Sequence, residues 1–262
     1  MRLLAIETST PAASVALIHD DGGLRVRRLE SGRPQTETLL MTIDQLLTEC
    51  RCAVRDLDGF AVSVGPGAFI GVRVGIATAK GLALGAGKPV VPISTLEALA
   101  MRALEPELLG AVPAHLVPQL TICPMIDARR GEVYTARYRP DGEREMVLLE
   151  GEETLTSPER FLERLTGPVL FLGDGAQLHR SVIIELFGER FGGRLGGDAL
   201  FPPLDRPELM APSAAAVARL ALRRWKEGSA IDPADLAVVY LRPAVEPSTD
   251  ATRTAMGVVR GS

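Results

Sequence analysis

Aromatic residues make up only 4% of the 262-residue sequence, and cysteine and histidine occur three times each. Cys50, Cys52 and Cys123 form no disulfide framework, and the pair Cys50 and Cys52 is either half of a metal site or, in our interpretation, two ordinary thiols at a helix end. The histidines are far apart and belong to no HxxxH or HExxH pattern. The sequence therefore argues against a disulfide-stapled fold and against a zinc or iron site built by this chain.

The sequence also lacks a basic excess and long apolar runs. A net charge of −4 and a pI near 5.6 argue against binding nucleic acid unaided, while leaving room for a local basic patch. We find no run approaching the roughly 18 to 20 apolar residues of a membrane helix. Near the N-terminus, Glu7 and a hydroxyl cluster interrupt any signal-peptide core. We expect a cytoplasmic protein without membrane contact.

Hydrophobic residues, mostly aliphatic, make up 46% of the chain, which favours α/β layers over an all-β sandwich. Apolar strands at 3–6, 13–18 and 24–29, with an Asp-Gly-Gly hairpin signal between the last two, precede a helix that starts at Thr36. A similar three-strand start recurs after residue 119, over 120–126, 132–139 and 145–149. This repetition predicts two halves, with domains at 1–110 and 111–245 and a tail at 246–262.

The stretch 60–97 organises the first half. It reads as a strand, the glycine turn 65–71, a helix and a second strand, which is a βαβ unit. Its GxGxxxG spacing is one residue longer than a dinucleotide fingerprint, no acid lies between Asp58 and Glu97, and no GK[ST] follows. We therefore interpret its glycines as permitting a tight turn and close helix packing.

A helical projection divides this helix into two faces. The small-residue face holds Gly71, Gly75, Thr78, Ala79, Leu82 and Gly85, and the opposite face holds Arg73, Ile76, Lys80 and Leu84. Glycine within a helix costs up to about 1 kcal/mol relative to alanine. Close approach of the sheet or of a partner would compensate for that cost.

The residues after the first strand allow two interpretations. Glu7, Thr8 and Ser9 stand where actin-like and sugar-kinase folds place acidic and hydroxyl groups against a nucleotide phosphate, but a simple hydrogen-bonded turn explains them as well. Asp127 and the Gly173-Asp174-Gly175 turn have analogous positions. No compact acid pair and no Ser/His/Asp set can be assigned, so we predict no catalytic residue.

The remaining second-half segments predict a helix over 213–227 and a last strand over 235–241. Seven stretches of the chain, taken together, resemble the bacterial TsaB (YeaZ) family of tRNA threonylcarbamoyladenosine biosynthesis. They are residues 4–10 with 14–16, 63–75, 79–83, 89–91, 94–99, 127–134 and the Val239-Tyr240-Leu241-Arg242 motif.

The resemblance implies an α/β, actin-like (ASKHA, ribonuclease H-like) duplicated fold of two subdomains, each with a mixed sheet and helices. It also implies a non-catalytic scaffold for a paralogue, TsaD, which transfers threonylcarbamoyl to the adenosine beside the anticodon. The ATPase TsaE would join the assembly, and tRNA would be reached only through the complex. The chain would form a homodimer when alone and hold no cofactor of its own, with ATP and metal on the partner subunits. The alternative is a free-standing actin-fold ATPase or small-molecule kinase using Glu7, Thr8 and Asp127.

In the family, the first two helices of the first half contact the partner, and here those helices are 36–49 and 71–85. The implied interface residues are Met41, Gln45, Gly71, Arg73, Gly75, Ile76 and Lys80. On this basis we expect Gly75→Leu to block assembly while the fold survives.

Two motifs depart from the family pattern. Gln35-Thr36-Glu37 replaces His-Ser-Glu, and Ala68-Phe69-Ile70-Gly71 replaces Ser-Phe-Thr-Gly. The second change removes two hydroxyls from the turn, which disfavours phosphate chemistry there and favours packing. The histidine pair that holds metal in the catalytic paralogue is absent as well.

Overall fold

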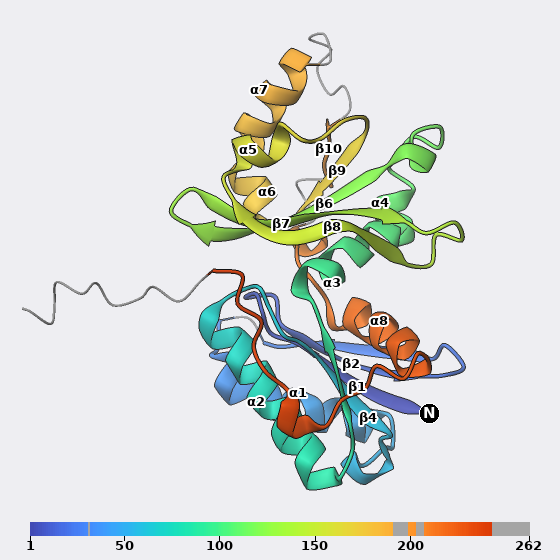
Figure 1. Cartoon of the computed structure of the whole chain (residues 1–262). Helices are drawn as coiled ribbons and strands as arrows, with labels where there is room; N and C mark the ends of the chain where they lie inside the picture. The colour runs from blue at the N-terminus through green and yellow to red at the C-terminus, as the bar shows by residue number, and fades with distance from the viewer. Residues whose placement is uncertain (31, 191–198, 203–206, 243–262) are drawn as a thin grey trace, which may run out of the picture.

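The computed structural model describes residues 1–30, 32–190, 199–202 and 207–242. Within them, two five-stranded sheets lie one above the other with helices packed around them (Figure 1). The tail expected at 246–262 lies outside the described residues.

The first sheet has the strand order β3-β2-β1-β4-β5. Strands β1, β2 and β3 pair antiparallel, and β1, β4 and β5 pair parallel. The parallel strands are buried on both faces, as expected of strands covered by helices on both sides. The strands are β1 (Arg2–Glu7), β2 (Ser14–His19), β3 (Leu24–Arg28), β4 (Gly59–Ser63) and β5 (Val90–Ile93).

The second sheet repeats this arrangement. Its order is β10-β9-β6-β7-β8, with β6 antiparallel to β7 and parallel to β9, so β6 takes the place that β1 holds in the first sheet. The repeated order confirms the predicted duplication and the actin-like fold. The strands are β6 (Thr121–Arg129), β7 (Glu132–Pro140), β8 (Val147–Thr156), β9 (Val169–Leu172) and β10 (Ala199–Leu200).

Successive side chains of β1 point to opposite faces of the first sheet, so the core of the first half has two layers. Leu4 and Ile6 point into the layer covered by α1 (Gln35–Glu49) and α2 (Phe69–Ala86). Leu3 and Ala5 point into the layer covered by α3 (Thr95–Met101) and α8 (Ala214–Lys226).

Helix α2 differs from the sequence expectation in one respect. It is 18 residues long with a mean hydropathy of 1.4, so by length and composition it could cross a membrane, contrary to our expectation that no run would. In the structure it packs on β4 and β1, and 33% of it is buried. It is thus a helix of the folded core, and its apolar outer face needs a separate explanation.

The second half places its own helices on one face of its sheet. These are α5 (Pro158–Leu162), α6 (Asp174–Leu178) and α7 (Arg180–Arg190). Helix α3 contacts β6, β7 and β8 on the other face and so lies between the two sheets (Figure 1).

Short elements complete the connections. Helix α3 ends at Met101, and Glu105 is extended before Pro106, as residues before proline usually are. The short elements are η1 (Val54–Asp56), η2 (Arg102–Leu104), α4 (Pro106–Leu109), η3 (Val117–Gln119), η4 (Pro207–Met210) and η5 (Pro233–Asp235).

Helix α8 follows the second half in sequence but packs on the first sheet. Its first amide, Ala214 N–H, donates to Ser14 Oγ at 2.9 Å, and Trp225 lies so close to Gly59 that a Cβ there would come within 2.3 Å of the indole ring. The predicted domain boundary near residue 110 stays a prediction. Because α8 packs on the first sheet, the chain crosses between the two halves a second time before this helix.

The last strand expected over 235–241 is wrong. Only an isolated bridge between Ile231 and Val90 extends the edge of the first sheet, after which the chain leaves the sheet and runs along α2 (Figure 1). Without a neighbouring strand the apolar residues of this segment form no ladder. Residues 236–242 are called the strap below.

Candidate functional site

The three candidate phosphate-binding residues lie where β1 ends, and all three are buried. Glu7 accepts hydrogen bonds from the Ser9 amide at 2.7 Å, from the Ser9 hydroxyl and, through its other oxygen, from the Ser63 hydroxyl of β4. Both carboxyl oxygens therefore have partners inside the chain. The geometry is that of a buried, hydrogen-bonded turn.

Burial sets the protonation of Glu7. Removal from water raises the pKa of this carboxyl above 4.5, and the hydrogen bonds from Ser63 and Ser9 offset only part of that rise. A carboxyl with a raised pKa favours its neutral form, which suits a buried position better than the charged form does.

Thr8 is covered by the glycine turn and by the start of α2. Its hydroxyl donates to the carbonyl of Gly71 at 2.8 Å. A Cβ on Gly71 would lie 2.1 Å from the Thr8 carbonyl oxygen, and one on Gly75 would lie 2.2 Å from the Thr8 hydroxyl. Both distances are far below van der Waals contact, so these positions have no room for a larger residue. The predicted tight turn and close packing take place against the chain's own β1–β2 turn.

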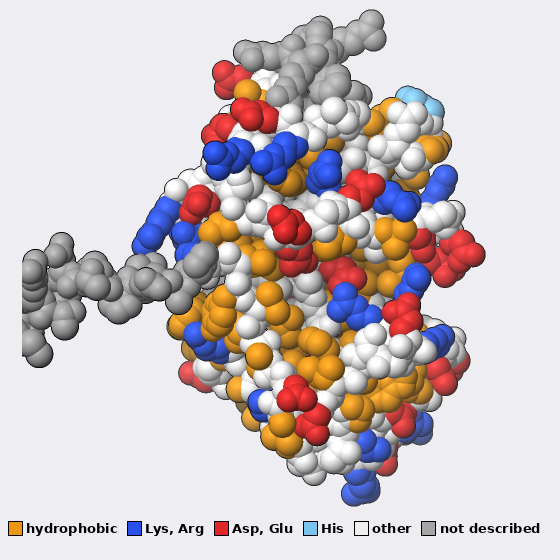
Figure 2. Space-filling view, viewed as in Figure 1, with side chains coloured by type: hydrophobic (Ala, Val, Ile, Leu, Met, Phe, Trp, Pro, Cys, Tyr) orange, Lys and Arg blue, Asp and Glu red, His pale blue; other side chains and the backbone are white. Residues whose placement is uncertain are grey.

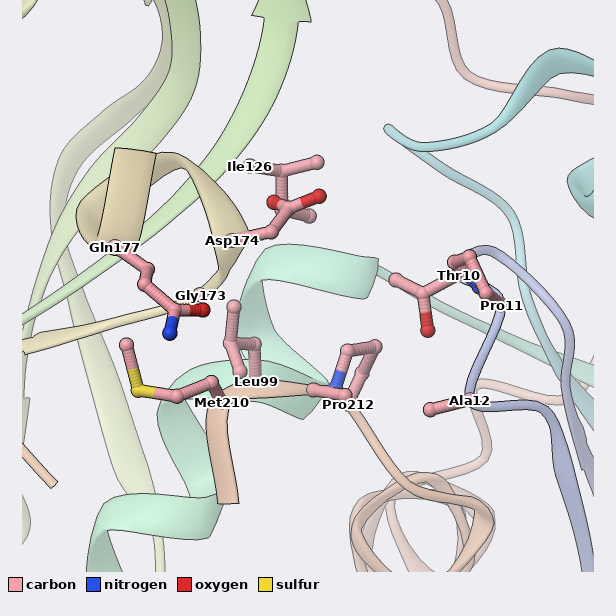
Figure 3. A pocket seen from close by; sticks show the side chains of 11 residues that line it. Thr10, Pro11, Ala12, Leu99, Ile126, Gly173, Asp174, Gln177, Met210 and Pro212 are labelled. Carbon is pink, nitrogen blue, oxygen red and sulfur yellow. The ribbon is translucent and has the colours of Figure 1, made fainter. Parts of the chain in front are cut away.

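A cavity of about 160 Å³ separates the two halves beside this turn (Figure 3). Thr10 and Ala12 approach it from the first half, and Asp174 and Gln177 from the start of α6 in the second. One Asp174 oxygen accepts from the amides of Asp127 at 3.0 Å and Gly175 at 2.8 Å. No lysine or arginine is among the described residues that line the cavity. It is smaller than the roughly 300 to 1,000 Å³ of ordinary ligand sites.

For metal ions, the described ranges contain no group of three or more His, Cys, Asp or Glu side chains able to bind one together. The thiol of Cys123 is buried, and burial raises its pKa. Cys52 is buried and Cys50 is partly buried at the end of α1, where the sequence placed them. All three cysteines have free thiols in this structure.

The seven predicted partner residues separate into two groups. Gly71, Gly75 and Ile76 are buried within the chain, the two glycines on Thr8 and Ile76 in the layer between α2 and the sheet. These three residues present little or no surface to a partner in this conformation. Because a side chain on Gly75 would collide with Thr8, we now expect Gly75→Leu to disrupt the packing of α2 rather than to spare the fold. The residues that reach the surface, fully or in part, are Met41, Gln45, Arg73 and Lys80.

Apolar and small residues are frequent on the outward side of α1 and α2. In the view of Figure 2, hydrophobic side chains gather on the lower half of the molecule, over α2 and the strap. Leu40, Met41, Ile70 and Leu84 are each at least half exposed. Added Cβ atoms on Gly81 and Gly85 would meet no atom within 4 Å, because both glycines point into solvent. We call this surface the docking face; its members are Leu40, Met41, Gln45, Ile70, Ala77, Gly81, Leu84 and Gly85.

Most residues of the docking face could not be identified from the helical pattern alone. A projection at 100° per residue grouped Gly85 with Gly71 and placed Ile76 on the free side. The signal that could have located the face is the i, i+4, i+8 series Ala77, Gly81 and Gly85, which continues past the buried glycines.

Comparisons with known proteins agree on one family. The model described as TsaD, tRNA N6-adenosine threonylcarbamoyltransferase, matches residues 29–183. The tRNA threonylcarbamoyladenosine biosynthesis protein TsaB of Escherichia coli is 34% identical over 247 residues, covering 92% of this chain and 95% of that protein. TsaB of Bacillus subtilis is 32% identical over 80% of this chain and 86% of its own. The crystal structure of YeaZ from Pseudomonas aeruginosa matches with a TM-score of 0.70 and 31% identity, over 92% and 99% of the two chains.

The raised pKa of Glu7 predicts a pH-dependent stability difference. Because the folded pKa lies above the unfolded one, the stabilisation is complete below about pH 4.5 and is lost as the pH rises through the folded pKa. Urea unfolding of the wild type and Glu7→Gln should therefore show the wild type losing stability relative to the variant by up to about 1.4 kcal/mol per pH unit in that interval. Glu143→Gln, at an exposed turn, is the control. A Glu7→Gln difference that stays constant with pH would contradict the assignment.

The two kinds of glycine in α2 predict opposite stability changes. Gly75→Ala pushes a methyl group into Thr8 and should lower the free energy of unfolding by about 2 kcal/mol or more. Gly81→Ala meets open space in a helix interior and should raise it by about 0.5–1 kcal/mol. Chemical denaturation of both variants measures the pair, and equal effects would show that α2 is not seated on Thr8 as described.

Proposed function

The chain belongs to the TsaB (YeaZ) family of tRNA threonylcarbamoyladenosine biosynthesis proteins, and from this premise we propose that it is a non-catalytic subunit that docks onto a catalytic paralogue. The partner we propose is TsaD, the threonylcarbamoyltransferase whose family model this chain itself matches. TsaE would complete the assembly in the cytoplasm. ATP and metal would reside on those subunits, and tRNA would be reached through them.

The observation that carries this proposal is the docking face. Monomeric soluble proteins seldom expose large contiguous apolar patches, and those that do commonly use them to bind other proteins. Here Ile70 is 72% exposed and Leu40 58%, although both belong to helices whose other faces are fully packed. Apolar side chains that are exposed to solvent do not stabilise the free chain, so their presence on these helices is better explained by binding to a partner.

Small residues on the docking face support a close approach. Gly81 and Gly85 add no side-chain volume on the outer side of α2, and Ala77 adds one methyl group. Helix axes packed at small residues come nearer to each other than the usual 8–10 Å range allows for larger side chains. The intrinsic helix cost of these glycines is then offset on assembly.

Charge supports self-association when the chain is alone. Helix α1 carries Glu37, Asp44 and Glu49 and no cation, whereas α2 carries Arg73 and Lys80 and no acid. A two-fold arrangement brings the same patch of both copies together, so Asp44 on α1 of one copy can face Arg73 on α2 of the other. The other charges of these helices have partners within the chain: Glu37 pairs with Arg33, Glu49 pairs with Arg27, and Lys80 donates to two backbone carbonyls. A paralogue with the same fold could take the place of one copy.

Two features weigh against the alternative of a free-standing ATPase or kinase. Hydrogen bonds within the chain already occupy the side chains of Glu7, Thr8 and Ser9, so few donors are free there to bind a phosphate. The cavity between the halves presents Asp174 and, among its described lining residues, no cation to offset a polyphosphate.

A bulky residue on the outer side of α2 tests the docking face. Gly81→Leu should weaken binding to TsaD by about tenfold or more while leaving the thermal midpoint at or above that of the wild type, because the new side chain meets solvent in the free chain and the partner in the complex. Isothermal titration calorimetry measures the affinity. Gly142→Leu, an equally open glycine in the β7–β8 turn, is the matched control. Normal assembly by Gly81→Leu would exclude this face.

Activity of the lone chain tests the choice between the two functions. We expect the purified protein neither to hydrolyse ATP at a useful rate nor to modify tRNA, and calorimetry with magnesium-ATP should detect no micromolar binding. Micromolar binding that Glu7→Gln or Asp174→Asn abolishes would favour the kinase alternative.

A further inference from the structure

The Val239-Tyr240-Leu241-Arg242 motif lies in the strap, outside the docking face. The Val239 amide donates to the carbonyl of Val64 at 2.8 Å, where β4 has just ended. Arg242 donates to the carbonyl of Ala128 at 2.9 Å and pairs with Glu132 at 2.9 Å, both on the β6–β7 hairpin. The strap is thus tied to both halves, and it runs beside α2 (Figure 1). Tyr240 lies between the two ties and contacts Arg73 of α2.

Tyr240 forms one wall of a cage around Arg73. The central guanidinium carbon of Arg73 lies 3.2 Å from the ring centre of Phe69 and 5.7 Å from that of Tyr240. Its Nη2 donates to the Tyr240 hydroxyl at 2.6 Å. Two aromatic faces and one hydroxyl therefore fix the plane and position of this cation.

Arg73 has no acidic partner within the described part of the chain. The sequence between Asp58 and Glu97 contains no acid, and among the described residues no carboxylate forms an ion pair with the guanidinium. Its Nη1 is buried and has no hydrogen-bond acceptor among the described residues. A positioned guanidinium with an unused donor is an incomplete interaction, since such donors are normally satisfied.

The walls of the cage are themselves exposed. Phe69 is 66% exposed, Ile70 72%, Val239 45% and Tyr240 58%, so apolar surface surrounds the cation. We call these four residues and Arg73 the caged-arginine patch. It continues the docking face beyond the first turn of α2 onto the strap, through Ile70, which belongs to both.

We propose that the caged-arginine patch is the specificity-determining anchor of the docking face and that it binds a carboxylate side chain, flanked by apolar residues, on the docked protein partner. This inference rests on the proposed function. The Phe69 ring that lies over the guanidinium is 66% exposed, so it can turn aside to admit a carboxylate that accepts from the guanidinium, while the apolar neighbours of that carboxylate pack on Ile70 and Val239. Arginine and tyrosine in such a setting are the residues that dominate protein interfaces.

The surroundings favour a protein carboxylate over a free phosphate or nucleic acid. The nearest predicted interface cation, Lys80, is occupied by the carbonyls of Ala234 at 2.8 Å and Leu236 at 3.4 Å. One cation ringed by apolar side chains matches an acidic residue within an apolar protein surface, whereas phosphate backbones are met by several cations.

The experiment measures the affinity of the full-length chain for full-length TsaD by calorimetry at several salt concentrations. Arg73→Gln removes the charge and should weaken binding about tenfold or more and flatten the salt dependence. Arg73→Lys keeps the charge without the planar fork and should lose less affinity while keeping the salt dependence. Tyr240→Phe keeps the ring and loses the hydroxyl that positions Arg73, which should weaken binding a few-fold. Arg219→Gln, an exposed cation on α8, is the control and should bind as the wild type does.

Thermal unfolding of each free variant separates folding from binding. If Arg73→Gln does not fold, Arg73→Lys and Tyr240→Phe decide, because both retain most of the cage. Wild-type affinity with unchanged salt dependence in the folded Arg73 variants would overturn the anchor and leave the proposed function standing. A wild-type chain that binds neither TsaD nor a second copy would overturn the proposed function and the anchor with it.

Discussion

The contact between α2 and the β1–β2 turn is the constraint on which the rest of the structure depends. Thr8 donates to the carbonyl of Gly71, and the backbone of α2 lies so close that neither Gly71 nor Gly75 could carry a Cβ in place. At the same place Glu7 is buried, and its carboxyl accepts hydrogen bonds from Ser9 and Ser63. The position that could have faced a phosphate is therefore filled by the chain itself.

The same seating decides what the outer side of α2 offers. Val72, Ile76 and Ala83 pack toward the sheet, so the opposite side of α2 presents Ile70, Gly81, Leu84 and other exposed residues. The glycines of α2 therefore serve two purposes. Gly71 and Gly75 let the helix approach the β1–β2 turn, and Gly81 and Gly85 leave its outer surface free of side chains. The inward use is required by the fold, and the outward use is the basis of the proposed docking.

The two halves are held together by helices and polar contacts around α3. Glu153 of β8 accepts hydrogen bonds from Ser94, the N-cap of α3, and from the Tyr138 hydroxyl at 2.9 Å. Arg224 of α8 pairs with Glu97 of α3, and burial raises the pKa of the Glu97 carboxyl despite this ion pair. The strap adds a further connection from α2 to the β6–β7 hairpin. A partner on the docking face would therefore contact an element that is joined to both halves.

The duplicated α/β fold could be predicted from the sequence, because the strand alternation and hairpin signals at residues 13–29 and 120–149 are local properties that strand pairing preserves. The family could be predicted too, from motifs spread along the chain. Which glycines of α2 face inward depends on tertiary packing, since a helical projection does not show where the β1–β2 turn approaches the helix. Tertiary packing likewise turned the expected last strand at 235–241 into a strap, because strand formation needs a neighbouring strand and the apolar pattern alone supplies none. The cage around Arg73 joins residues 167 positions apart, and that juxtaposition exists only in the folded chain.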